Sequence, residues 1–179
     1  SKVEKLAKEV EETNRRILDE VRRASEENKD LVRRIEETVK RAVEEIKRLI
    51  EKIDDVVTKN PEKKERVKEL VEEIRERIKR ILRELERLIE EADRRLEEVL
   101  RKLKKLIDDD RRKIDRVEEA GVDEEIIKEL RKRSEDSERE ARKLIRRNEE
   151  ENEKLRKKLK EIIDRLREEL EKVLDRVRK

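Results

Sequence analysis

The sequence lacks the residue types on which most protein chemistry depends. Its 179 residues include no cysteine, no histidine, no methionine and no aromatic side chain. The absence of cysteine excludes disulfides, thiolate nucleophiles and cysteine-ligated metals. The absence of histidine removes the commonest metal ligand and the commonest general base near neutral pH. Without aromatic rings the chain also has no platform on which nucleic-acid bases could stack.

Glycine and proline each occur once. A single glycine excludes the GxGxxG and GxxxxGK[ST] phosphate-binding loops. No run of about 20 apolar residues is present, so no membrane-spanning helix is expected, and the charged opening segment predicts no signal peptide. We therefore expect a soluble protein with no enzymatic activity, cofactor or metal, and with no native location beyond the cytoplasm of the cell that expresses it.

What the chain has in abundance is charge. Lys and Arg account for 56 residues and Asp and Glu for 53, which leaves a net charge of +3. The two signs are interspersed, whereas nucleic-acid binding needs a basic stripe and an anionic membrane attracts a polybasic cluster. With 61% charged and 31% hydrophobic residues, the chain could still be disordered. The spacing of the apolar residues decides between disorder and a fold.

The apolar residues recur with the period of a straight helix. An 18-residue step is five turns of a 3.6-residue helix, and it links apolar residues throughout the chain. A strict seven-residue repeat would impose a left-handed supercoil, and it fits less well. Apolar residues outside the stripe are few, with Leu18 and Leu174 the clearest, so the pattern predicts straight helices and excludes disorder. Examples of the 18-residue series are Ile17, Ile35 and Ile53; Val67, Leu85 and Leu103; Ile126, Leu144 and Ile162; and Ile127, Ile145 and Ile163.

Two short segments interrupt the helical composition. At the first, Asn60 suits an N-cap and Pro61 suits the first helical position. At the second, Gly121 suits the left-handed position that ends a helix, and Asp123 suits the N-cap of the next. The sequence therefore predicts helices near 2–58, 61–119 and 123–178. Short connections between equal helices imply an up-down-up order, so we predict a single all-α domain over 1–179, a straight antiparallel three-helix bundle.

Several core positions hold polar residues, and the predicted pairing groups them at two levels. The parallel first and third helices are expected to be offset by about 121 residues if the connections are short. The first level then contains Thr13, Asn14, Asp110, Ser134 and Ser137. The second contains Ser25, Asn28, Asn148 and Asn152, facing the small side chain of Ala92.

This grouping predicts two buried hydrogen-bond networks. A buried amide without partners costs about 1–3 kcal/mol, whereas grouped polar side chains can satisfy one another. Their expected role is to fix helix register and order in a repetitive core. Asp110 could instead turn outward with Asp108 and Asp109. A polar ligand pocket at Asn28, Asn148 and Asn152 is the functional alternative, but no aromatic side chain would line it.

Taken together, these features resemble de novo designed, parametrically generated helical bundles. They are the uniform Glu, Lys and Arg surface, the Leu, Ile, Val and Ala core, the equal helices, the caps at Asn60–Pro61 and 120–123, and the grouped core Ser, Thr and Asn. The resemblance covers the whole chain. It implies a monomeric antiparallel three-helix bundle with buried hydrogen-bond networks, high thermal stability and no natural biochemical function.

An interaction module is the alternative to this scaffold. In that case the polar residues of the first and third helices would face a partner helix or a second copy of the chain. A fourth helix would require a wider apolar stripe on the helices that contact it. The apolar stripe of the first helix is slightly wider than that of the second, because it includes Leu6, Leu18 and Val43.

Small-angle scattering combined with light scattering tests the predicted assembly. We expect a particle of 22.0 kDa, with a length of roughly 85 Å at 1.5 Å per helical residue. Twice that mass, or a much thicker particle, would favour the interaction module.

Overall fold

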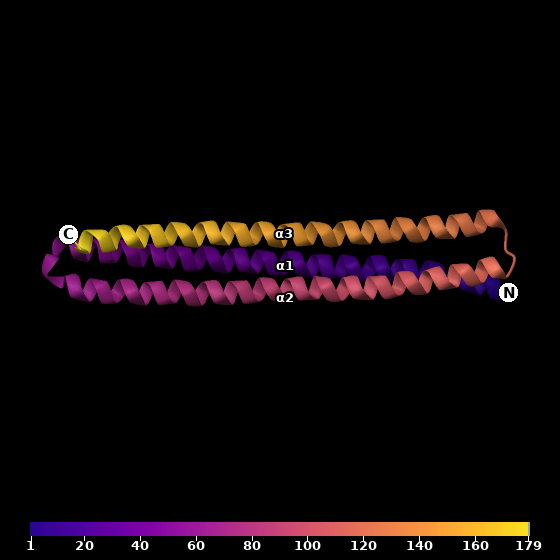
Figure 1. Cartoon of the computed structure of the whole chain (residues 1–179), viewed down its shortest axis with the longest axis horizontal. Helices are drawn as coiled ribbons and strands as arrows, with labels where there is room; N and C mark the ends of the chain where they lie inside the picture. Colours follow the sequence, from indigo (N-terminus) through magenta and orange to yellow (C-terminus); the bar gives the residue numbers. More distant parts are fainter. Residues whose placement is uncertain (179) are drawn as a thin grey trace. The chain divides into compact units, whose positions relative to one another are not determined.

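The chain forms three long helices in a computed structural model that describes residues 1–178 (Figure 1). Helix α1 covers Lys2–Lys59, a short 3-10 helix η1 covers Pro61–Lys63, α2 covers Lys64–Glu119 and α3 covers Glu124–Arg178. No strand occurs among the described residues, and the predicted all-α three-helix bundle is confirmed. The second helix differs slightly from the prediction, because its first turn is a 3-10 turn and α2 begins at Lys64.

The first connection is set by Pro61 and not by a side-chain cap. The Asn60 amide donates to the Val56 carbonyl at 2.9 Å, which closes the end of α1. The Lys63 amide donates to the Asn60 carbonyl at 3.1 Å and closes the following turn. The Asn60 side chain makes no capping hydrogen bond, contrary to the prediction. Because Pro61 has no amide hydrogen, the turn has one fewer backbone N–H group that would need a hydrogen-bond acceptor.

The second connection follows the predicted cap chemistry closely. Gly121 has a φ of +81°, the left-handed conformation that side chains disfavour and that commonly ends a helix. Its amide donates to the Glu118 carbonyl at 3.1 Å. On the far side, Asp123 Oδ1 accepts a hydrogen bond from the Glu125 amide at 3.4 Å and so caps the first turn of α3.

The chain divides into two compact units, and each contains a segment of all three helices. The first unit comprises residues 1–30 and 92–151, and it includes the connection between α2 and α3. The second comprises residues 31–91 and the described part of the segment from residue 152 onward, and it includes the connection between α1 and α2.

Each unit keeps the predicted register between α1 and α3. In the first unit Arg133 Nη1 donates to Glu11 Oε1 at 2.9 Å, and the two residues are 122 positions apart. In the second unit Arg176 pairs with Asp54, also 122 positions apart. Both separations are close to the expected value of about 121 for parallel first and third helices joined by short connections.

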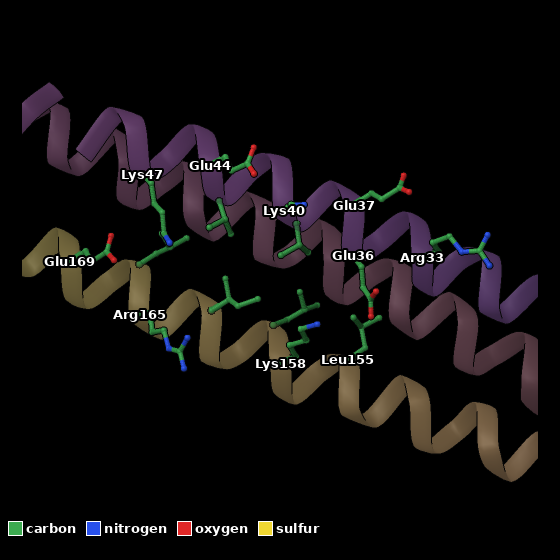
Figure 2. Close-up of a pocket in the computed structure, with 15 residues that line it drawn as sticks. Arg33, Glu36, Glu37, Lys40, Glu44, Lys47, Leu155, Lys158, Arg165 and Glu169 are labelled. Carbon is green, nitrogen blue, oxygen red and sulfur yellow. The ribbon is translucent and has the colours of Figure 1, made fainter. Parts of the chain in front are cut away.

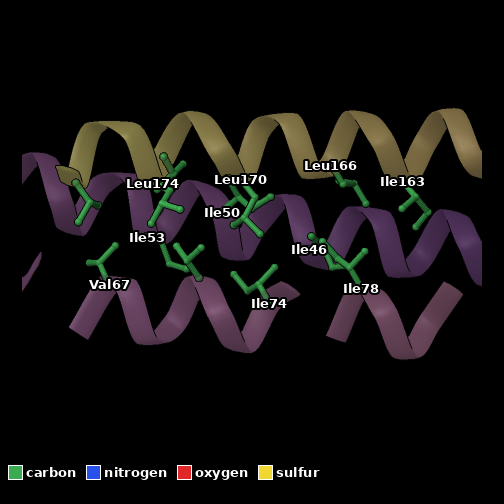
Figure 3. Packing of buried hydrophobic residues seen from close by; sticks show 13 residues of the cluster. Ile46, Ile50, Ile53, Val67, Ile74, Ile78, Ile163, Leu166, Leu170 and Leu174 are labelled. Atoms are coloured by element: carbon green, nitrogen blue, oxygen red, sulfur yellow. The ribbon is translucent and has the colours of Figure 1, made fainter. Parts of the chain in front are cut away.

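The core of each unit consists of branched aliphatic side chains from all three helices. Figure 3 shows one such cluster in the second unit, where Ile50 of α1, Ile74 of α2 and Leu170 of α3 meet. Burial of one such side chain contributes about 1.5–3 kcal/mol. Leu174 belongs to this cluster and is 5% exposed, so its predicted place outside the stripe is wrong.

One predicted core position lies at the surface. Ile126 is 47% exposed, because it lies in the first turn of α3, where Ile127 takes the buried position instead. No helix among the described residues has a segment long and apolar enough to cross a membrane.

Substitution of Gly121 by Ala tests the second connection. A Cβ added at this position meets nothing within 4 Å, so the backbone conformation is the sole cost. We expect the free energy of unfolding to fall by about 1 kcal/mol, measured by chemical denaturation. Gly121→Asn is the matched control, because asparagine tolerates the left-handed region better, and it should lose less. An alanine variant as stable as the parent would contradict this account.

Candidate functional site

The nine predicted core polar residues are all buried, and none is more than 9% exposed. They are Thr13, Asn14, Ser25, Asn28, Asp110, Ser134, Ser137, Asn148 and Asn152. Asp110 is 0% exposed, so the alternative in which it turns outward is wrong. A buried polar group requires a partner or carries a desolvation cost, and the partners of each residue therefore define the site.

In the first unit, one polar level lies between two apolar clusters. Along α1, Asn14 lies between Val10 and Ile17, which belong to different clusters. The same alternation occurs in α2, where Asp110 separates Ile107 from Ile114. It occurs again in α3, where Ser134 and Ser137 lie between Leu130 and Ala141. All three helices therefore contribute polar side chains to the same interruption of the core.

The centre of this level is a hydrogen bond between two helices. Ser134 Oγ on α3 donates to Asp110 Oδ2 on α2 at 2.5 Å. The second carboxyl oxygen, Asp110 Oδ1, is buried and has no hydrogen-bond partner among residues 1–178. Among residues 1–178, Asp110 is also the one buried residue that has an ionisable side chain. One oxygen of the buried carboxyl group therefore accepts a hydrogen bond, and the other does not.

Burial raises the pKa of Asp110 above its ordinary value, and it outweighs the neighbouring groups that oppose it. The Ser134 hydrogen bond and the Lys113 ammonium favour the carboxylate, whereas the carboxylate of Asp109 disfavours it. Lys113 Nζ lies 3.9 Å from a Glu9 oxygen and 4.0 Å from an Asp109 oxygen. Because that ammonium group is shared with two other carboxylates, it compensates Asp110 only in part.

The remaining members of the first level do not join this pair. The Thr13 hydroxyl donates to the Glu9 carbonyl of its own helix at 2.8 Å, as the Thr38 hydroxyl does to the Arg34 carbonyl. Asn14 Oδ1 is buried without a partner among the described residues. Asn14 and Ser137 line a shallow surface groove instead. The predicted network of five residues thus contains one hydrogen-bonded pair.

At the second level, Ser25 Oγ on α1 donates to Asn148 Oδ1 on α3 at 3.3 Å, a long hydrogen bond. Asn148 Nδ2 is buried with no partner among residues 1–178. Asn28 is 5% exposed and Asn152 is 1% exposed, and each makes polar interactions. Asn152 belongs to the second unit, whereas Ser25, Asn28 and Asn148 belong to the first.

The polar side chains link helices, and the one ionisable group among them is out of contact with solvent. A general acid or base must reach the proton of a bound substrate, and the Asp110 carboxyl is closed off from solvent. Among the described residues, no group of three or more carboxylates is placed to hold a metal ion. What the polar side chains do make are hydrogen bonds between helices, from α3 to α2 and from α1 to α3.

A groove between α1 and α3 in the second unit was not foreseen from the sequence. It has a volume of about 560 Å³, and its basic lining includes Arg33, Lys40 and Lys47 (Figure 2). These three residues recur at seven-residue intervals. That spacing places them along one edge of a helix, and it was the one sequence signal that could have indicated the groove.

Replacement of Asp110 by Asn tests the electrostatic account. The buried group binds its proton more tightly in the folded state than in the unfolded state, where its pKa is about 3.9. The stability it contributes is therefore complete below the unfolded pKa and is lost as the pH rises through the raised folded pKa. We expect Asp110→Asn to be more stable than the parent at pH 7, by about 1 kcal/mol, with the advantage shrinking toward pH 3.

The measurement is the difference in unfolding free energy between variant and parent across this pH range. Asp108→Asn is the matched control, since Asp108 is exposed on the same helix, and its difference should be small. An Asp110→Asn variant whose advantage is independent of pH would show that Asp110 does not titrate as described.

Comparison with known proteins assigns this chain to no family. No protein-family model matches the chain, and no curated protein matches it. Among solved structures, the chain is similar to one described as "Computationally designed three helix bundle". The two are 22% identical, with a TM-score of 0.44, and the match covers 99% of this chain and 84% of that one. A likeness at this level carries no argument about this chain. The three-helix fold therefore rests on the helices of the chain itself.

Proposed function

We propose that this chain is a designed structural scaffold with no natural biochemical function, and that its buried polar residues specify how the helices align. The observation that carries the proposal is the polar level of the first unit. There, all three helices place polar residues between two apolar clusters, and Asp110 of α2 is bonded to Ser134 of α3. The proposal includes the absence of enzymatic activity, of a cofactor and of any obligatory partner.

The alignment role follows from the cost of misplacing a polar group. An apolar core with an 18-residue period offers several registers of similar packing. If α2 moved by one turn toward Leu130 of α3, Asp110 would lose Ser134 and would face an aliphatic side chain. Leaving a buried polar group without its partner costs about 1–3 kcal/mol, and more for a charged group. The register that pairs Asp110 with Ser134 is therefore favoured over the one that places Asp110 against Leu130.

The same burial weighs against the interaction module built on the polar levels. Binding a partner helix through these residues would need their side chains at the surface. Asn148 and Asn152 are each 1% exposed, and Asp110 is 0% exposed. A ligand pocket at Asn28, Asn148 and Asn152 meets the same objection, since a ligand would have to part the helices to reach them.

We further propose that the chain is monomeric and behaves as one domain. Each of the three helices passes without a break from the residues of one unit into those of the other. A helix interrupted by unfolding of one unit would lose hydrogen bonds at its new end. We therefore expect a single thermal transition, with a midpoint above about 60 °C as in idealised bundles.

Replacing the polar pairs by apolar residues tests their role directly. The variant combines Asp110→Leu with Ser134→Ala, and Asn148→Leu with Ser25→Ala. We expect its thermal midpoint to stay level or rise, because apolar replacement of buried polar groups is often neutral or stabilising. We also expect more than one helix alignment, visible as additional or broadened amide signals in NMR spectra.

Thr38→Val is the control, because Thr38 is exposed and bonds its own helix. Its spectrum should keep one set of signals. If the variant with four substitutions also keeps one sharp set of signals, the polar residues do not specify alignment and the proposal fails.

A further inference from the structure

Three surface grooves follow the seams between helices in the second unit. The α1–α2 groove has a volume of about 870 Å³, and its lining has three basic and three acidic side chains. The α2–α3 groove, of about 430 Å³, is balanced in the same way. The α1–α3 groove, of about 560 Å³, has five basic and four acidic side chains. Among these three, the α1–α3 groove is the one with a surplus of positive charge.

The floor of the α1–α3 groove is apolar and incompletely covered. Val43 of α1 and Ile162 of α3 are half-buried, above the more deeply buried Val39 and Leu159. Two valines on successive turns of α1 fill less space than the Leu and Ile residues opposite them on α3. Short side chains at these positions are consistent with the space that the groove leaves between the two helices.

Basic residues form a row along each rim of the groove. On α1 the row is Arg33, Lys40 and Lys47, and on α3 it is Lys158 and Arg165. Residues seven apart lie nearly two turns apart on the same edge of a helix, so each row runs along its rim. These five residues form the basic rows.

The four acidic residues of the lining are placed less uniformly. In Figure 2, Glu37 and Glu44 point away from the groove, whereas Lys47 extends from α1 toward α3. Glu36 points toward the groove, and Glu169 belongs to the α3 side of the lining. The rims are therefore mainly basic, with one acidic residue on each.

Four members of the basic rows have no ion-pair partner. Lys40, Lys47, Lys158 and Arg165 make no ion pair with any residue among 1–178. Elsewhere in this unit the seams are bridged, as by Arg77 Nη2 of α2, which lies 2.5 Å from Glu45 Oε1 of α1. Lys40, Lys47, Lys158 and Arg165 are thus available to carboxylates from outside the chain.

We propose that the α1–α3 groove of the second unit binds an acidic amphipathic helix. The apolar face of such a helix would pack on Val43 and Ile162, as helices commonly pack into grooves between two others. Carboxylates that flank its apolar stripe at seven-residue intervals would face the basic rows, which is the arrangement that selects partners in coiled coils. Charge complementarity then determines which helix binds.

A second copy of this chain fits the groove poorly. If two copies met by antiparallel contact of their α1 helices about Lys40, that residue would face its own counterpart. Arg33 would face Lys47 of the other copy, and Glu36 would face Glu44. Like charges placed opposite one another disfavour association, so the proposed occupant is a different, acidic helix.

The probe is a fluorescein-labelled peptide of about 21 residues, three heptads with Leu at the a and d positions and Glu at e and g. Its binding to the full chain is measured by fluorescence anisotropy at low salt. We expect binding that is lost for the same peptide with Lys at e and g. We also expect the variant Lys40→Glu, Lys47→Glu, Lys158→Glu to weaken binding by about tenfold or more.

The matched control is Lys52→Glu, Arg80→Glu, Lys160→Glu, which changes the net charge equally. These three residues line the other two grooves, and they are expected to leave binding nearly unchanged. Circular dichroism checks that both variants fold. If the first loses helicity, the corresponding substitutions to Gln replace it.

The proposal is overturned by absence of binding at about 1 mM peptide, the weak end of specific affinity. It is equally overturned by equal binding of the lysine peptide, or by equal weakening in both triple variants. A dimer in sedimentation that only the first variant dissociates would assign the groove to a second copy and would overturn the acidic-helix proposal.

Discussion

Each helix buries one stripe of Ile, Leu and Val side chains against the other two, and the fold depends on this burial. With 31% hydrophobic residues, the chain has few apolar side chains to spare for any other surface. Ile126 is the one large hydrophobic residue that is clearly exposed among the described residues. Helix propensity alone does not hold helices in place, because most helical stability in proteins comes from packing of such a face.

The polar levels interrupt this burial at a cost. Asp110 Oδ1, Asn14 Oδ1 and Asn148 Nδ2 are buried without partners among residues 1–178, and an unsatisfied polar atom lowers stability. A core chosen for stability alone would place aliphatic residues at these positions. Their presence is consistent with a different requirement, namely one helix alignment in preference to others with nearly equal packing.

The charged surface contributes less to stability than its extent suggests. Most of its ion pairs are exposed, for example Arg87 with Glu84 and Glu91 on α2. Exposed pairs of this kind contribute about 0–1 kcal/mol each. The charged side chains keep the surface hydrated, and their signs determine which other molecules can bind there. At the α1–α3 groove the same surface leaves four cations other than Arg33 without an ion pair to residues 1–178 beside an apolar floor, and that seam differs from the other two in this respect.

The sequence by itself left open whether Asp110 is buried, but it determined the three helices, the positions of their connections and the burial of the other eight polar residues. These follow from local rules: the 18-residue period, the single proline at Pro61 and the single glycine at Gly121. The α1–α3 offset was also predictable, because short connections leave little freedom. Only the tertiary structure decided which polar side chains bond, with Thr13 turning to its own helix and Ser134 to Asp110. It also decided the burial of Leu174 and the groove above Val43 and Ile162. These features depend on how side chains from three helices fill shared space, and the spacing of residues along one helix does not specify this.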